Sequence, residues 1–272
     1  MSLAYELRGS GPPVVFVHAA IADSRMWEPQ WSSFAARYRR LRLDLPGFGH
    51  TPIESLPVTY ARDVAGALDE VEISAAGIVG ASLGGRVALE LAVARPDLVR
   101  ALVLVDAGLP GADWSEVVQA YGAVEDEAVS RGDLAAATEI NLRMWVDGPR
   151  RSPEDVDPAV RAAVAEMQGR ALELQAPHWE RLDEDLLVPD VAERLGEVHV
   201  PTLVLVGEED VDDMHRLARR FAAEIPQARL ETIPGAAHVP SLEQPAAFDE
   251  LVLEFLAEIK APPPPRRAPR RG

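Results

Sequence analysis

The fold is decided by the stretch Ile78–Arg86, which reads Ile-Val-Gly-Ala-Ser-Leu-Gly-Gly-Arg. Apolar residues lead into it, and a run of small and apolar residues, Val87–Ala94, follows with helical spacing. The pattern predicts a buried strand that stops abruptly, a tight turn and a helix that begins at once. Glycines two residues on either side of Ser82 leave room for the backbone to fold back, as a nucleophile elbow requires. The start of the helix would point free N–H groups at developing negative charge.

Strands and helices alternate on both sides of this stretch. The apolar, β-branched run Val14–Val17 predicts a buried strand, and the spacing of Thr59–Val71 is helical. Such alternation implies an α/β fold with a mainly parallel, doubly wound sheet and helices on both faces. The other expected strands are residues 3–7, 40–45, 98–105, 200–206 and 228–233, and the other expected helices are residues 31–38, 214–225 and 244–260.

Helical, polar patterns fill residues 111–195 without a convincing strand among them. We interpret this stretch as a helical cap inserted into a core formed by residues 1–110 and 196–260. The alternative is that these helices pack on the sheet like the others. The expected cap helices are residues 114–131, 133–145 and 158–174.

Composition narrows the class of protein and its partners. The 272 residues are 47% hydrophobic and 26% charged, which suits one large soluble α/β domain with an inserted unit. The net charge of −17 argues against nucleic acid or an anionic membrane surface as a partner. The sequence has no cysteine, so disulfides, a thiol nucleophile and a zinc–thiolate site are excluded.

Targeting signals are not evident in the sequence. Met1–Leu7 lacks the basic start and apolar segment of a signal peptide, and no apolar run is long enough to cross a membrane. We therefore expect a cytoplasmic protein that acts on a small-molecule substrate, with its oligomeric state left open. The tail, residues 261–272, is rich in Pro and Arg and is expected to be disordered.

A serine hydroxyl becomes a good nucleophile only when a neighbouring base takes its proton. His238 is the best of the six histidines, since it follows an expected strand and lies among small residues that allow close approach. Asp210 also follows an expected strand, so it projects from the edge where open α/β sheets bind ligands. The order Ser82, Asp210, His238 is the serine–acid–histidine order of this type of site.

Other acidic residues compete with Asp210 as the partner of the histidine. Asp106 ends the strand after the elbow helix and is the main alternative, although chain order favours Asp210. No group of His, Asp and Glu has metal-ligand spacing, so we expect neither a metal nor a cofactor. Four further acids lie close to Asp210 in the chain: Glu208, Glu209, Asp212 and Asp213.

Taken together, the motifs resemble those of the α/β-hydrolase superfamily over nearly the whole chain apart from the tail. Val15–His18, followed by Trp27, resembles its His-Gly oxyanion loop, and Asp44–Thr51 is similar to its Asp-x-Pro-Gly-x-Gly-x-Ser loop. Pro201–Asp210 resembles its acid strand, and Gly235–His238 its histidine loop. The resemblance implies the α/β-hydrolase fold and is nearest to capped small esterases, enol-lactonases and carbon–carbon bond hydrolases.

The resemblance also implies an oxyanion hole made by the backbone N–H groups of Leu83 and Ala20, with His18 bracing the loop. Ala19 stands where the family usually has glycine. If that position needs positive φ, alanine costs about 1 kcal/mol, or the loop takes another path. Thr51 replaces the usual serine and keeps its hydroxyl.

Substrate specificity is expected to come from the cap. Trp145 lies near the end of an expected cap helix and would line the pocket from above; the alternative is that it packs between cap helices. Arg143 could pair with a substrate carboxylate or with an acidic neighbour such as Glu139. The candidates for lining the pocket are Trp145, Met144, Arg143, Phe48, Trp27 and His178.

These residues predict a cofactor-independent serine hydrolase of a small ester, thioester or lactone, acting through an acyl-enzyme. A serine nucleophile argues, by resemblance, against haloalkane dehalogenases and epoxide hydrolases, which use a carboxylate. Two alternatives remain open because one fold hosts many functions. The same triad could serve carbon–carbon bond hydrolysis, acyl transfer or cofactor-free peroxide chemistry, or the chain could be a ligand-binding protein with a vestigial triad.

Overall fold

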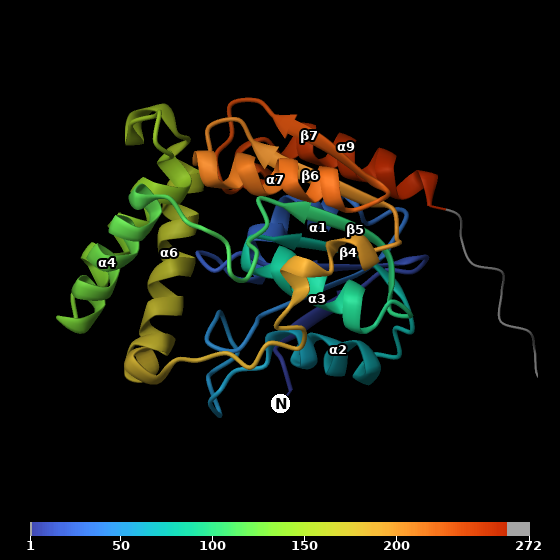
Figure 1. Cartoon of the computed structure of the whole chain (residues 1–272), viewed down its shortest axis with the longest axis horizontal. Helices are drawn as coiled ribbons and strands as arrows, with labels where there is room; N and C mark the ends of the chain where they lie inside the picture. The colour runs from blue at the N-terminus through green and yellow to red at the C-terminus, as the bar shows by residue number, and fades with distance from the viewer. Residues whose placement is uncertain (1, 260–272) are drawn as a thin grey trace, which may run out of the picture.

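A seven-stranded sheet forms the centre of the protein, which we describe from a computed structural model of residues 2–259. The strands are β1 (Tyr5–Arg8), β2 (Pro13–Val17), β3 (Arg39–Leu43), β4 (Ala76–Ala81), β5 (Val99–Val105), β6 (Thr202–Gly207) and β7 (Ala228–Ile233). They lie in the order β1-β3-β2-β4-β5-β6-β7 (Figure 1). β1 is antiparallel to β3, and the other neighbouring pairs are parallel. The predicted α/β fold with a mainly parallel sheet is confirmed.

Helices cover both faces of the sheet because its central strands are apolar at nearly every position. All residues of β4 and β6 are buried, and neighbours along a strand face opposite layers. One face is covered by α1 (Glu28–Ser33) and α9 (Pro245–Glu258), and the other by α2 (Tyr60–Glu70), α3 (Leu83–Ala94) and α7 (Asp212–Glu224). Val79 packs in the layer of α1 and α9, whereas Ile78 packs in the layer of α2, α3 and α7. Burying each such side chain contributes about 1.5–3 kcal/mol.

The helix expected at residues 31–38 begins and ends earlier, as α1. Pro29 lies in its first turn, where the fixed φ of proline favours helix initiation. The chain leaves the helix at Phe34, whose ring is buried edge-on against Phe16 with centroids 5.3 Å apart. Core packing of that ring therefore overrides the helical spacing of the following residues.

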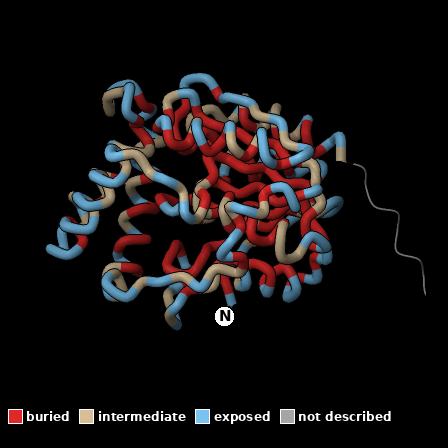
Figure 2. Tube along the Cα trace, in the orientation of Figure 1, coloured by how far each residue is buried: buried red, intermediate tan, exposed pale blue. Residues whose placement is uncertain are grey.

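A separate helical unit lies beside the sheet (Figure 1). It comprises α4 (Glu116–Ser130), α5 (Leu134–Asn141), a π-helical segment η2 (Leu142–Asp147), α6 (Pro158–Gln175) and η4 (Ala176–Arg181). The side chains of Ser115 and Asp133 cap α4 and α5 by accepting backbone N–H groups. A small cluster that includes Val129 and Leu172 holds the helices together, and α4 is otherwise largely exposed (Figure 2). We refer to residues 116–181 as the cap.

The segment after the cap differs from the predicted boundary at Leu195. Val188, Val191 and Leu195 are buried in the main core with residues of α3, and the Val188 N–H donates to Glu90 of α3 at 3.1 Å. Apolar residues spaced along this irregular segment bury themselves against the core, so the cap helices end at Arg181 and the chain returns to the core earlier than expected.

The remaining elements are short, and residues 261–272, expected to be disordered, lie outside the described part of the chain. None of the helices in residues 2–259 combines the length and apolar character needed to cross a bilayer. The short helical elements are η1 (Ser24–Trp27), η3 (Pro153–Asp155), η5 (Val191–Glu193), η6 (Leu195–Glu197) and α8 (Pro240–Glu243).

Candidate active site

Ser82 lies alone between the end of β4 and the start of α3, in a strained conformation with φ 50° and ψ −109°. Its N–H donates to the Val105 carbonyl at 2.8 Å, and its own carbonyl accepts the N–H groups of Arg86 and Gly108, each at 3.1 Å. A positive φ is costly for a residue with a Cβ, and surrounding hydrogen bonds must hold it in place. Three hydrogen bonds to backbone groups therefore hold the backbone of Ser82 in this conformation.

The two glycines of the turn are required by close contacts between backbones. A Cβ on Gly80 would lie 2.3 Å from the Gly84 carbonyl oxygen, and one on Gly84 would lie 2.2 Å from the carbonyl oxygen of Val17. Both distances are far below any real Cβ contact, so no side chain fits at either position. The glycines thus allow α3 to begin directly against β4 and β2, which fixes the position of Ser82.

His238 and Asp210 meet in loops that follow β7 and β6. The Nδ1 atom of His238 lies 2.6 Å from Oδ2 of Asp210, and both side chains are buried. The second oxygen, Oδ1, accepts the Val211 N–H at 2.7 Å. Burial lowers the pKa of His238 and raises the pKa of Asp210. The hydrogen bond to Asp210 leaves Nε2 of a neutral His238 as the proton acceptor.

The histidine loop is held by contacts from both sides. A Cβ on Gly207 would lie 2.0 Å from the Ala237 carbonyl oxygen, so this glycine lets the loops after β6 and β7 touch. The N–H of Ala237 donates to Glu243 at 2.8 Å, and the N–H of His238 donates to the Trp145 carbonyl of the cap at 3.1 Å. The position of His238 therefore depends on core and cap together.

Asp106, the competing acid, lies next to this pair. It is buried at the end of β5 with a positive φ of 42°, and its Oδ1 accepts the Gly207 N–H at 3.0 Å. One carboxylate oxygen each of Asp106 and Asp210 and one ring nitrogen of His238 lie within 4.8 Å of one another. The sequence spacing did not indicate this grouping. Burial and the neighbouring Asp210 raise the pKa of Asp106 well above its usual range. Oδ2 of Asp106 has no hydrogen-bond partner among the described residues, so we interpret the cluster as two buried carboxyl groups beside one histidine.

The loop after β2 holds Ala20 beside Ser82. Both residues line one cavity. His18 braces this loop: its Nδ1 lies 2.8 Å from the Ala19 carbonyl oxygen, and its Nε2 accepts the Leu45 N–H at 3.0 Å. Within residues 2–259, Ala19 is not among the non-glycine residues with positive φ, so alanine is accommodated there without that strain.

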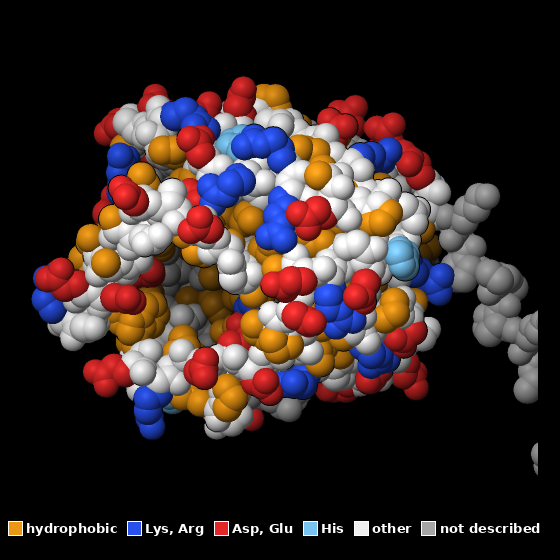
Figure 3. Space-filling model, in the orientation of Figure 1, with side chains coloured by type: hydrophobic (Ala, Val, Ile, Leu, Met, Phe, Trp, Pro, Cys, Tyr) orange, Lys and Arg blue, Asp and Glu red, His pale blue; other side chains and the backbone are white. Residues whose placement is uncertain are grey.

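The cavity that contains Ser82 has a volume of about 250 Å³ and lies between the core and the cap. Figure 3 shows the surface hollowed between the cap and the core. The core contributes Ser82 and His238, whereas most of the wall comes from cap side chains. The lining residues are Ala20, Ile21, Ser82, Tyr121, Glu125, Asn141, Trp145, Gln168, Gln175, Trp179 and His238.

Trp145 is the predicted cap residue that lines this cavity. Its ring packs against the His238 ring with centroids 4.5 Å apart and meets Tyr121 edge-on at 5.5 Å. It lies on the π-helical segment η2, a type of irregularity that is frequent at functional sites. The widened turn places the indole over the histidine.

The other predicted pocket residues lie elsewhere. Arg143 is exposed and pairs with Asp147 at 2.8 Å, not with Glu139, and Met144 packs half-buried against the main core. Phe48 and Trp27 are buried core residues: Phe48 packs on His18 at 4.8 Å, and Trp27 packs on Phe16 at 5.2 Å. His178 lines a different hollow on the cap. Large aromatic side chains near a loop are thus used here for packing.

Five polar lining residues were missed by the sequence analysis: Tyr121, Glu125, Asn141, Gln168 and Gln175. They come from three cap helices, α4, α5 and α6, and are far apart in sequence. No local motif marks them, since each has the appearance of an ordinary polar position on an amphipathic helix.

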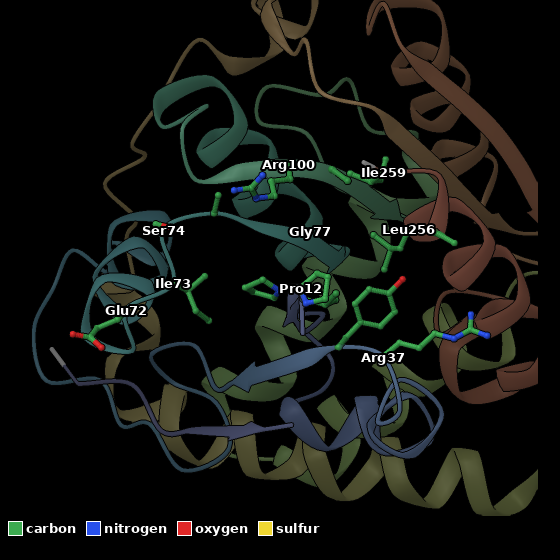
Figure 4. A pocket seen from close by; sticks show the side chains of 15 residues that line it. Pro12, Arg37, Glu72, Ile73, Ser74, Gly77, Arg100, Leu256 and Ile259 are labelled. Atoms are coloured by element: carbon green, nitrogen blue, oxygen red, sulfur yellow. The ribbon is translucent and has the colours of Figure 1, made fainter. Parts of the chain in front are cut away.

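A larger cavity, with a volume of about 460 Å³, lies at the opposite, amino-terminal edge of the sheet. Figure 4 shows Pro12, Gly77 and Arg100 from the strand side and Leu256 from α9 around it. None of its lining residues is shared with the cavity of Ser82. Ligands of open α/β sheets bind at the carboxyl ends of the strands, so the smaller cavity is the candidate site.

Comparison with known proteins gives a consistent result. A sequence model described as the alpha/beta hydrolase family matches residues 14–251. The chain is 29% identical to the putative carbamate hydrolase RutD of Azorhizobium caulinodans, over 94% of this chain and 96% of that protein. It is 30% identical to the putative non-heme bromoperoxidase BpoC of Mycobacterium tuberculosis, over 96% of this chain and 100% of that protein. A solved thermophilic esterase from Thermogutta terrifontis is similar with a TM-score of 0.77 and 26% identity, covering 95% of this chain and 94% of that chain.

Proposed function

The chain belongs to the alpha/beta hydrolase family, and on that premise we propose that it is a cofactor-independent serine hydrolase of a small ester, thioester or lactone. The observation that carries the proposal is the buried Asp210–His238 hydrogen bond of 2.6 Å beside the same cavity that Ser82 lines. A nucleophile, a base and an acid that orients the base are the parts that this chemistry needs.

In the proposed reaction, Oγ of Ser82 attacks the substrate carbonyl carbon while Nε2 of His238 takes the hydroxyl proton. His238 then gives that proton to the leaving alcohol, thiol or ring oxygen, and an acyl-enzyme remains. Water, deprotonated by His238, attacks the acyl carbon, and the proton returns to Ser82 as the acid leaves. Asp210 holds the tautomer of His238 and stabilises its cationic form in both halves.

The negative charge on the carbonyl oxygen is held by backbone N–H groups. Leu83 begins α3, so its N–H has no partner within the helix, and Ala20 borders the cavity from the opposite loop. We propose these two N–H groups as the oxyanion hole. Removing one such donor typically costs about 3 kcal/mol of transition-state stabilisation.

The size of the cavity supports a small substrate. Its volume of about 250 Å³ is below the ~300–1,000 Å³ typical of sites for drug-sized ligands. The similarity to a solved esterase at 26% identity supports ester chemistry on this fold.

Replacement of Ser82 by alanine tests the proposal. The rate of hydrolysis of a short activated ester, measured through the appearance of its product, should be lower by at least about 10⁴-fold in Ser82→Ala. The circular dichroism spectrum should be unchanged. Ser130→Ala, at the exposed end of α4, serves as the matched control and should retain activity. Wild-type rates in Ser82→Ala would overturn the proposal.

A second candidate is peroxide chemistry on the same triad, favoured by the 30% identity to the putative non-heme bromoperoxidase of Mycobacterium tuberculosis. Hydrogen peroxide would replace water in the second half-reaction, so that the acyl-enzyme yields a peracid. Product analysis with an acetate ester in water and in peroxide distinguishes the two: acetate alone supports hydrolysis, and peracetate supports the second candidate.

A further inference from the structure

The cap wall of the active-site cavity carries an ordered chain of polar groups. The Tyr121 hydroxyl donates to Oδ1 of Asn141 at 2.6 Å. Nδ2 of Asn141 donates to Oε1 of Glu125 at 2.5 Å and to the Ala137 carbonyl at 2.9 Å. The hydrogen-bonding capacity of Asn141 is thus used within the cap. This series of hydrogen bonds ends at the carboxyl group of Glu125, which lines the cavity.

Glu125 brings a carboxyl group to this wall without a basic partner. Within residues 2–259, no salt bridge involves Glu125, and neither Lys nor Arg is among the residues that line the cavity. Its neighbours there are the hydroxyl of Tyr121, the amide of Asn141 and, further along the wall, the imidazole of His238. Burial raises the pKa of Glu125. A partly buried carboxyl group that lines a cavity without a cation beside it gains most from a ligand that donates a hydrogen bond or carries positive charge.

Gln168 provides a second, independent acceptor on the same wall. It comes from α6, lines the cavity and is only 4% exposed. Among the described residues its Oε1 has no hydrogen-bond partner. Leaving a buried acceptor unsatisfied costs about 1–3 kcal/mol, which a donor on a bound ligand would offset.

We propose that the cavity recognises a nitrogen hydrogen-bond donor, an ammonium or amide N–H group, on the part of a small ester that lies beneath the cap, with Glu125 and Gln168 as the acceptors. The inference rests on the proposed serine hydrolysis and adds the substrate class to it. Anionic substrates are disfavoured, since a substrate carboxylate would meet Glu125 without a neighbouring cation.

Matched esters test the inference. In the first series, p-nitrophenyl butanoate is the reference, and p-nitrophenyl 3-aminopropanoate replaces its terminal methyl by an ammonium group of the same size. p-Nitrophenyl malonamate carries an amide at that end, and p-nitrophenyl hemisuccinate carries a carboxylate. A second series of acetates compares 2-aminoethyl with propyl leaving groups, which covers the other side of the scissile bond. Dividing each kcat/KM by the rate constant for hydroxide hydrolysis removes differences in intrinsic reactivity.

In one of the two series, kcat/KM should be at least ~10-fold higher for the N–H substrate than for its alkyl isostere, as expected for a charge-assisted hydrogen bond. Glu125→Gln should remove most of the ammonium preference, because kcat/KM for the ammonium substrate should fall by a larger factor than kcat/KM for the butanoate. Gln168→Leu should weaken both the ammonium and the amide substrates. The control is Glu127→Gln, an exposed residue on the same helix that pairs with Arg131, and it should keep the preference.

A binding measurement separates this inference from the proposed reaction. Calorimetry with Ser82→Ala should show methyl 3-aminopropanoate binding at least ~10-fold more tightly than methyl butanoate, which has no N–H group, and Ser82→Ala/Glu125→Gln should lose that difference. Equal binding of the two methyl esters, or a kinetic preference that survives both Glu125→Gln and Gln168→Leu, overturns the inference even if Ser82 hydrolyses esters. If no ester is hydrolysed but the binding difference is present, the proposed reaction fails and the recognition of an N–H donor stands.

Discussion

The core loops and the cap build the two halves of one cavity in different ways. In the core, Ser82 and His238 are fixed by short segments at strand ends, with backbone hydrogen bonds and glycines that no other residue can replace. In the cap, the wall consists of side chains spread over three helices and held by side-chain hydrogen bonds. A site fixed by backbone tolerates little change, whereas a wall of side chains can vary while the fold stays the same. Under the proposed function, the core half carries the reaction chemistry and the cap half sets the specificity.

Asp210→Asn, a change in the core half, should have the largest effect on catalysis. The amide cannot stabilise the cationic form of His238 and favours the wrong tautomer, so kcat should fall by about 10⁴-fold. Steady-state kinetics with a short activated ester measure it. Asp212→Asn, a neighbouring exposed carboxylate at the start of α7, is the control and should lose less than threefold. A similar loss in both variants would contradict the role given to Asp210.

Arg151→Ala should remove contacts that join the cap to the histidine loop of the core and should destabilise the protein. Arg151 donates to Glu243 at 2.7 Å and to the Val146 and Gly235 carbonyls, and both members of the ion pair are largely buried. Glu243 in turn accepts the Ala237 N–H of the histidine loop. Leaving Glu243 buried without its cation should lower the free energy of unfolding by about 3 kcal/mol or more in urea denaturation.

The matched control is Arg131→Ala, whose exposed pair with Glu127 lies on α4. It should cost less than about 1 kcal/mol. Equal stability of the two variants would show that the cap and the histidine loop are not coupled through Arg151.

The pH profile of kcat/KM should distinguish a buried from an exposed base. His238 must be neutral to accept the serine proton, so activity falls as the pH falls through its pKa. Burial lowers that pKa, while the acidic groups that face it, Asp106, Asp210 and Glu243, act in the opposite direction. The acid limb should therefore have its midpoint below the ordinary histidine value of about 6.5. A midpoint above that value would mean that the acidic neighbours outweigh burial.

Asp106→Asn should have the smallest effect. If the two buried carboxyl groups share one proton, a neutral amide at position 106 leaves the net charge of the pair unchanged. We expect kcat to fall by less than about tenfold, measured beside Asp210→Asn in the same assay. A loss as large as that of Asp210→Asn would assign the acid role to Asp106 or to both residues.

The fold and the meeting of Asp210 with His238 beside the cavity of Ser82 could be predicted because their signals are local. The elbow sequence, the buried strands and the order of Ser82, Asp210 and His238 all lie in continuous segments whose physical requirements are strict. The proximity of Asp106 to Asp210 could not be predicted in the same way, since it depends on β5 and β6 being neighbours in the sheet. Chain order alone made the two acids look like alternatives, whereas they are partners in one cluster.

Predictions for the residues that line the pocket were less accurate, for a physical reason. Phe48 and Trp27 are large aromatic side chains near loops, but burying their area in the core stabilises the fold more than exposing it in a pocket would. Conversely, Glu125 and Gln168 look like ordinary polar helix positions, and only the packing of α4 and α6 against α5 and η4 turns them toward one cavity. Side-chain walls built from several helices leave no pattern in any one of them.

The central claim, that Ser82 is a nucleophile activated by His238, is tested most directly by covalent labelling with a fluorophosphonate followed by peptide mapping. We predict one adduct, on the peptide that contains Ser82, which is absent in Ser82→Ala and forms far more slowly in His238→Ala. An adduct on a different serine, or ester hydrolysis that persists while Ser82 stays unlabelled, would contradict the claim.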